Sequence, residues 1–149
     1  MNRYLTGRAA DVLLVVGDPS DLCLILDSLH QAKVKNRLHH VGSVSEASSY
    51  MRREGPYKYA PVPGLVLLDA GLPQRSVADF VAELKTDAQF AGIPVIAIVG
   101  SDAEHQLIEN SLYAFDGSIR KPFSLSQLVH ALISVETLSF LMVQSAPAT

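Results

Sequence analysis

The stretch that decides the fold of this chain is Leu65-Val66-Leu67-Leu68-Asp69-Ala70-Gly71-Leu72-Pro73, in which four apolar residues end at an acid. An unbroken apolar run of this length is typical of a strand buried on both faces of a parallel sheet. Gly71 and Pro73 predict a loop directly after the strand. Reactive groups in open parallel α/β sheets collect at the carboxyl ends of the strands, so Asp69 is a candidate nucleophile or metal ligand.

Strand and helix signals alternate along the rest of the chain. Further strands are expected at residues 12–16, 37–41, 95–99 and 115–119. Helices are expected to start near residue 19 and to cover residues 44–54, 77–85, 102–113 and 124–138. The clearest helix starts are the capping boxes at residues 43–46 and 101–104.

This alternation predicts one α/β domain. Five strands alternating with helices specify a doubly wound parallel sheet of the flavodoxin-like order 2-1-3-4-5, with helices on both faces. The domain is expected to span residues 11–137, after an N-terminal extension of residues 1–10. An apolar patch at residues 138 and 140–143 follows the complete domain, so residues 138–149 are expected to form a C-terminal arm.

The composition argues against several function classes. The chain has 149 residues, a net charge of −3, no tryptophan and no basic stripe, so nucleic-acid binding is not expected. It has no apolar run long enough to span a bilayer and no secretory signal at its start, which indicates the cytoplasm. Its lone Cys23 cannot form an internal disulfide and is expected to be a small buried residue in a reducing compartment.

The chemical signal is the pairing of Asp69 with Lys121. The predicted strand ends bring both residues to one edge of the sheet, where a carboxylate can accept a phosphoryl group and an ammonium can neutralise its charge. Such a transfer also needs a divalent cation held by further acids. His39 and His40 are adjacent, so in a strand they face opposite sides and cannot ligate one metal together.

Three stretches together resemble the receiver domain of two-component response regulators, over residues 11–136. They are residues 65–73, Gly92-Ile93-Pro94-Val95 and Arg120-Lys121-Pro122-Phe123. The chain is also similar to the single-domain regulators that partner phytochrome-type histidine kinases. That likeness rests on residues 83–87, on the long loop of residues 55–64, which is rich in proline and tyrosine, and on residues 125–128.

The resemblance implies roles for individual residues. Asp69 matches the phosphoacceptor and Lys121 the phosphate-sensing lysine, which in receivers is followed by a cis peptide bond. The two adjacent acids that hold Mg²⁺ in the family align with Val16 and Gly17, so both are missing. Asp18 follows one residue late and could join Asp69 as a metal ligand only if its loop shifts, and we favour helix capping for it.

Two further positions depart from the family pattern. The hydroxyl residue that receivers place at the end of the fourth strand aligns with Val99, and the aromatic switch residue aligns with Ser118. A methyl group cannot donate a hydrogen bond to a phosphoryl group. The resemblance therefore implies that the usual relay of hydroxyl and ring does not operate.

The favoured interpretation is a degenerate, single-domain receiver: a non-enzymatic signalling protein of a two-component phosphorelay that acts through protein contacts. Its expected partners are a sensor histidine kinase, of phytochrome type, and a second copy bound through residues 124–138 and the arm. No cofactor is expected. In the alternative, Asp69 accepts phosphate from a kinase with Mg²⁺ and a displaced Asp18. A flavodoxin-like enzyme or nucleotide binder is more distant, because residues 16–19 are not a glycine-rich phosphate loop.

Overall fold

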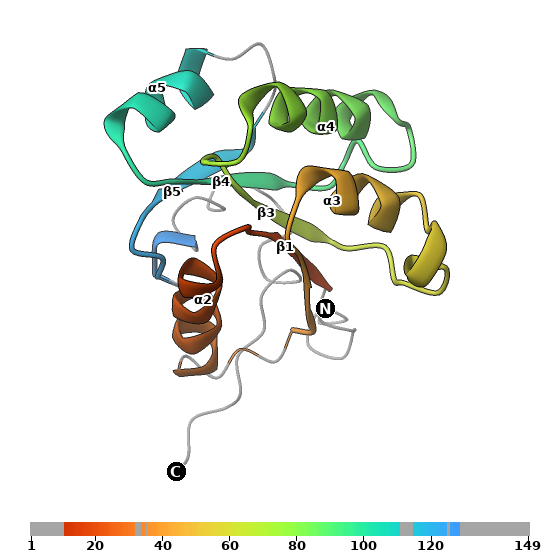
Figure 1. Ribbon diagram of the computed structural model, residues 1–149, viewed down its shortest axis with the longest axis horizontal. Helices are drawn as coiled ribbons and strands as arrows, with labels where there is room; N and C mark the ends of the chain where they lie inside the picture. Colours follow the sequence, from red (N-terminus) through yellow and green to blue (C-terminus); the bar gives the residue numbers. More distant parts are fainter. Residues whose placement is uncertain (1–10, 32–33, 35, 111–114, 125, 129–149) are drawn as a thin grey trace, which may run out of the picture.

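The computed structural model describes residues 11–31, 34, 36–110, 115–124 and 126–128, and strands alternate with helices along the chain (Figure 1). The strands are β1 (Val12–Val15), β2 (Leu38–Val41), β3 (Leu65–Asp69), β4 (Val95–Val99) and β5 (Gly117–Arg120). The helices are α2 (Pro19–Gln31), α3 (Val44–Met51), α4 (Gln74–Thr86) and α5 (Asp102–Asn110), with a short 3-10 turn, η1 (Gly55–Tyr57), before β3.

The five strands form one parallel sheet in the order β2-β1-β3-β4-β5, which confirms the predicted flavodoxin-like arrangement. Every residue of β1, β3 and β4 is buried, as expected for central strands with helices on both faces. In the register, Asp69 lies beside Ile98, and Val99 lies beside Arg120. The carboxyl ends of β3, β4 and β5 therefore meet at one edge of the sheet.

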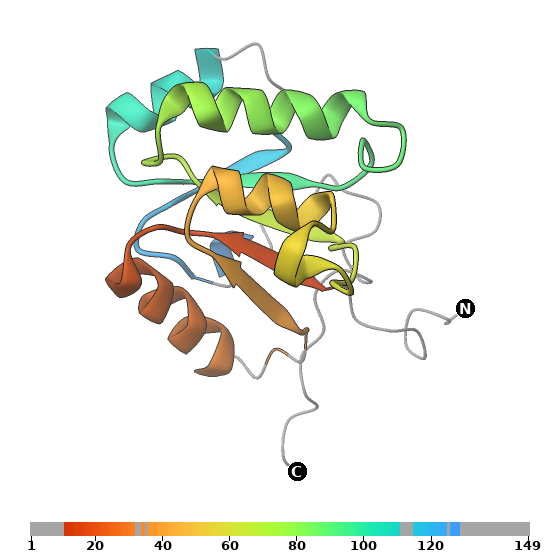
Figure 2. The same cartoon turned by 45° about the vertical axis from the view of Figure 1, so that its right-hand side comes forward.

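Helices cover both faces of the sheet. On one face, alternate residues of β1 and β3 pack against α3 and α4, with Phe80 of α4 fully buried. On the other face, the remaining residues of these strands pack against α2. Figure 2 shows α2 on the side of the sheet opposite α3 and α4. A smaller cluster of Ala70, Ala97, Val99 and Ile108 joins α5 to the first face.

Helix α2 corrects one prediction. Its sheet-facing stripe consists of residues 22, 25, 26 and 29, the spacing of an amphipathic helix. Cys23 lies beside this stripe and is exposed. The prediction of a buried cysteine is wrong because an apolar run in a helix buries only the residues at the i, i+3, i+4 and i+7 positions.

Helix α3 starts where its capping box predicts, with the Glu46 amide donating to Ser43 Oγ at 3.1 Å. It ends at Met51, before the predicted residue 54. The reason is Arg53, which has a positive φ of 56°. Its amide donates to the Tyr50 carbonyl at 3.1 Å, and the Glu54 amide donates to the Ser49 carbonyl at 2.9 Å. This pair of bonds is a Schellman motif, which usually places glycine at the left-handed position.

The last predicted helix is described only at its start. Ser124 caps it, because the Gln127 amide donates to Ser124 Oγ at 3.2 Å. The rest of the helix predicted over 124–138 lies outside the described residues, as do the extension of residues 1–10 and the arm of residues 138–149. The predicted domain boundaries and the dimer contact therefore stay predictions.

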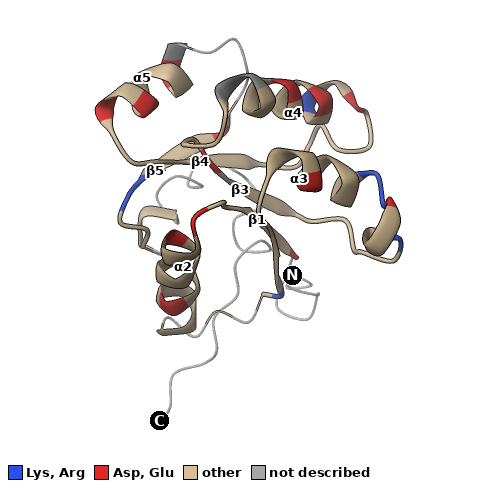
Figure 3. Cartoon of the chain, viewed as in Figure 1, with Lys and Arg blue, Asp and Glu red and all other residues tan. Residues whose placement is uncertain are grey.

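The surface charges follow no single pattern. Figure 3 shows acidic residues on all four labelled helices and basic residues on turns, at strand ends and on α4, without a basic stripe on any described element. None of the described helices has both the length and the apolar character that a membrane span requires.

Candidate functional site

Asp69 lies at the carboxyl end of β3 and is only 6% exposed. Its Oδ1 accepts a hydrogen bond from the Gly71 amide at 2.8 Å. A Cβ atom at Gly71 would lie 3.2 Å from Asp69 Oδ1, closer than ordinary contacts. Glycine at this position therefore lets the backbone approach the carboxylate.

Lys121 follows β5 at the same edge, as the sequence predicts. Its amide donates to the Val99 carbonyl at 2.8 Å, and its peptide bond to Pro122 is cis, as the resemblance implies. Its Nζ lies 3.6 Å from Asp69 Oδ1. The structure thus brings together the two residues that the sequence analysis singled out.

Two further carboxylates, which the sequence analysis did not assign to the site, complete it. Asp21 of α2 accepts a hydrogen bond from Lys121 Nζ at 2.8 Å, through its Oδ2. Glu104 of α5 accepts a hydrogen bond from the Gly100 amide at 2.9 Å. The available signals were indirect: Asp21 is in the first turn of a helix that starts at this edge, and Glu104 closes the capping box 101–104.

Glu104 borders the same space as Asp69. A Cβ at Gly71 would lie 3.7 Å from Glu104 Oε2, and a Cβ at Gly100 would lie 3.6 Å from Glu104 Oε1. Asp21 and Asp69 therefore flank the ammonium of Lys121, and the charge of Glu104 acts on it as well. Burial lowers the pKa of Lys121, but its hydrogen bond with Asp21 and the charges of Asp69, Asp21 and Glu104 outweigh burial and raise the pKa above its ordinary value of 10.5.

The end of β1 supplies no acid to this edge. Val16 is buried in the apolar cluster between the sheet and α2. Its carbonyl is hydrogen-bonded to His40 Nε2 at 2.8 Å. A Cβ at Gly17 would lie 3.1 Å from Leu72 Cδ2 and 3.2 Å from the Gly42 carbonyl oxygen. Mg²⁺ needs several well-placed oxygen ligands, and no group of three or more His, Cys, Asp or Glu residues in the described chain could hold a metal.

Asp18 is placed as a helix cap. It is exposed, and its Oδ1 accepts a hydrogen bond from the Ser20 amide at 2.7 Å. The Leu22 amide donates to the Asp18 carbonyl at 3.0 Å. Because these bonds hold Asp18 at the start of α2, Asp18 and Asp69 do not fit as a pair of Mg²⁺ ligands.

At and near the switch positions, Val99 is apolar and the hydroxyl of Ser101 is already hydrogen-bonded. Val99 is buried with Ala70, Ala97 and Ile108, and Phe115 packs against this cluster. The nearby hydroxyl of Ser101 accepts a hydrogen bond from the Glu104 amide at 3.2 Å and therefore caps α5. Ser118 lies on β5 and is half-buried. Phe115 was expected to start a strand over residues 115–119, but β5 starts at Gly117 and Phe115 packs against the cluster around Val99.

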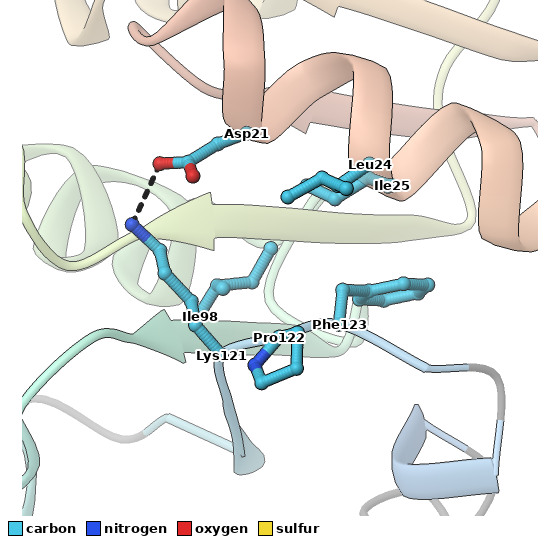
Figure 4. A pocket seen from close by; sticks show the side chains of 7 residues that line it. All are labelled: Asp21, Leu24, Ile25, Ile98, Lys121, Pro122 and Phe123. Atoms are coloured by element: carbon cyan, nitrogen blue, oxygen red, sulfur yellow. Dashed lines mark hydrogen bonds and ion pairs between the residues drawn. The ribbon is translucent and has the colours of Figure 1, made fainter.

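A small apolar pocket lies behind Lys121, between α2 and the loop after β5. Figure 4 shows the ion pair of Asp21 and Lys121 at one end of this pocket. The pocket is lined by Asp21, Leu24, Ile25, Ile98, Lys121, Pro122 and Phe123. The stem of Lys121 thus runs beside apolar groups while its ammonium faces the carboxylates.

Comparisons with known proteins point to one class. No family model matches the chain. The response regulator Rcp1 of Synechocystis sp. is 25% identical over 126 residues, which are 85% of this chain and 86% of Rcp1. The structure of the phosphorylated cyanobacterial phytochrome response regulator RcpA matches with 30% identity and a TM-score of 0.68, over 87% of this chain and 93% of RcpA. The bacteriophytochrome response regulator AtBRR matches with 26% identity and a TM-score of 0.77, over 85% and 91%.

Proposed function

The chain belongs to the receiver domains of two-component response regulators, and on that premise we propose that it is a degenerate receiver. In this proposal it signals through protein contacts, and Asp69 does not carry a phosphoryl group. The proposed partner is a histidine kinase of phytochrome type, because the similar proteins Rcp1, RcpA and AtBRR are response regulators, and the last two are described as phytochrome or bacteriophytochrome regulators.

The observation that carries the proposal is the end of β1. Receiver phosphorylation relies on a divalent cation that neutralises the charge spread over the transferred group. Here Asp69 is the one acid at a family metal position, since Val16 is apolar and Gly17 has no side chain. A side chain at position 17 would be in close contact with Leu72 and the Gly42 carbonyl.

The cation beside Asp69 is Lys121, which already lies between carboxylates. Three carboxylates around one ammonium leave the site with excess negative charge. An incoming phosphate donor is also anionic, so this field opposes its approach. Because this position is Val99, buried in an apolar cluster, the site lacks the hydroxyl that would hold the transferred group.

The test is incubation of the full chain with acetyl phosphate and Mg²⁺, followed by intact mass spectrometry. We expect no added phosphoryl group, with RcpA as the positive control under the same conditions. A stable mass gain that Asp69→Asn abolishes would overturn the proposal.

A gain-of-function series sharpens this test. The variant Val16→Glu with Gly17→Asp and Val99→Thr restores the family residues, and adding Leu72→Ala removes one of the two close neighbours of a side chain at position 17, the other being the Gly42 carbonyl. We expect phosphorylation of Asp69 to appear in the variant with all four substitutions. It should be weaker in the variant with three. If neither gains phosphate, missing acids are not what prevents the reaction.

The second candidate is a working phosphoreceiver. It is favoured by the retained geometry of Asp69 and Lys121 and by the similarity to RcpA, which is described as phosphorylated. The same mass measurement decides between the two candidates, because a working receiver gains phosphate without any substitution.

A further inference from the structure

Lys121 makes its shortest ionic contact with Asp21. Its Nζ is 2.8 Å from Asp21 Oδ2 and 3.6 Å from Asp69 Oδ1. Only the shorter contact has hydrogen-bond length. The ammonium is therefore hydrogen-bonded to helix α2 and stands beside the family's phosphoacceptor position without bonding to it.

The pair is better fixed than an ordinary surface ion pair. The side chains of Lys121 and Asp21 are only 29% and 24% exposed. The lysine backbone is held by its bond to the Val99 carbonyl, and its stem passes Gly100 at contact distance, since a Cβ there would lie 3.4 Å from Lys121 Cδ. A lysine with a fixed stem loses little further entropy on pairing, which is the main cost of exposed pairs.

Helix stabilisation alone does not explain the position of Asp21. An acid in the first turn of a helix is favourable because of the helix dipole, and Asp21 is such a residue. The amide hydrogen bond at this helix start goes to Asp18, however. The Asp21 carboxylate is instead directed across the sheet edge to a residue 100 positions away, as Figure 4 shows.

We propose that Asp21 is a positioning residue, which holds the ammonium of Lys121 on α2 and makes this side chain the resident cation of the site. The proposal deepens the proposed function and rests on it for its meaning: Asp21 takes one of the three N–H donors of Lys121, so a phosphoryl group on Asp69 would compete with Asp21 for this side chain. The contact thus opposes movement of the ammonium away from α2.

The test follows the ammonium of Lys121 directly, by NMR of the ¹⁵N-labelled full chain. A hydrogen-bonded, shielded lysine ammonium exchanges its protons slowly enough to be seen. Lys121→Met assigns the signal by its loss. Lys85 is an internal reference, because its Nζ is held by Asp116 Oδ2 at 2.8 Å far from α2.

We expect Asp21→Asn to accelerate proton exchange of the Lys121 ammonium at least tenfold, roughly the loss of one charge-assisted hydrogen bond. Asp21→Glu should restore much of the protection, because it keeps the carboxylate. Asp18→Asn is the matched control on the same helix; asparagine also caps helices, so neither the helix nor the Lys121 signal should change.

The outcomes separate this inference from the proposed function. Unchanged exchange in Asp21→Asn, or an equal loss of the Lys85 signal, would overturn the positioning role even if Asp69 stays unphosphorylated. Phosphorylation of the unmodified chain by acetyl phosphate would overturn the proposed function. In that case the Asp21 variants alone test the positioning role.

Discussion

Replacing Lys121 by methionine should destabilise the fold through the carboxylates that it leaves behind, above all that of Asp69, which is less exposed than Asp21. Methionine keeps most of the apolar stem beside Pro122 and removes only the charge. Lys121 Nζ and Asp69 Oδ1 are 3.6 Å apart, and two unit charges at that distance attract by about 4–5 kcal/mol at an effective dielectric constant near 20.

Part of this attraction is lost to hydration. The side chain of Lys121 is 29% exposed, whereas that of Asp69 is 8% exposed. The free energy of unfolding should therefore fall by about 2 kcal/mol, less than the penalty for splitting a fully buried pair. In a chain of 149 residues, this corresponds to a drop in Tm of roughly 4–8 °C.

Urea and thermal unfolding of four proteins provide the assay: the unmodified chain, Lys121→Met, Asp69→Asn and the double variant. In the Lys121→Met background, Asp69→Asn should restore at least about 1 kcal/mol, because it removes a buried charge without a counter-ion. Lys58→Met, at an exposed lysine, controls for the loss of any lysine. If Lys121→Met costs no more than Lys58→Met, and Asp69→Asn has the same effect in both backgrounds, the electrostatic reasoning is wrong.

Four further predictions concern other parts of the chain. Tyr50→Phe should lower the free energy of unfolding by about 1 kcal/mol in urea titrations, because the Tyr50 hydroxyl donates to the Pro61 carbonyl at 3.1 Å. Arg53→Gly should raise it by about 0.5–1 kcal/mol, since Arg53 has a φ of 56°; a loss of stability would contradict this. The pKa of Lys121 is raised above 10.5, so its stabilising effect should be complete below pH 10.5 and be lost as the pH rises through the higher folded-state value, as unfolding of the chain and Lys121→Met across that range will test. Sedimentation should find a dimer for the intact chain and a monomer for a version that ends at Glu136, with circular dichroism confirming that both are folded.

Most of the fold could be predicted because its signals are local. Buried central strands appear as unbroken apolar runs, and the capping boxes at 43–46 and 101–104 mark helix starts whatever the tertiary contacts are. The end of α3 could not be placed, because its left-handed residue is Arg53 and no glycine marks the position. The prediction for Cys23 was wrong because apolar character alone does not bury a helical residue: Cys23 lies outside the stripe of residues 22, 25, 26 and 29.

Only part of the candidate site could be predicted, because topology places residues at strand ends but not residues on helices. Asp69 and Lys121 each end a strand, and the topology brings strand ends together. Asp21 and Glu104 belong to helices, and whether a helical side chain reaches the sheet edge depends on the helix's rotation and tilt. Sequence spacing does not determine either, so the carboxylate that makes the shortest contact with Lys121 became visible only in three dimensions.

The contact between Asp21 and Lys121 also has a consequence for how the chain folds. It joins residues 100 positions apart. Between them lie four of the five strands, β2 to β5, and β5 is the edge strand of the sheet. Contacts of such long sequence separation form only after the intervening segments are in place, because closing so large a loop costs entropy that local contacts must first offset. The protected ammonium of Lys121 should therefore appear last in refolding, after the β1–β3 core, and would report that the final strand has docked.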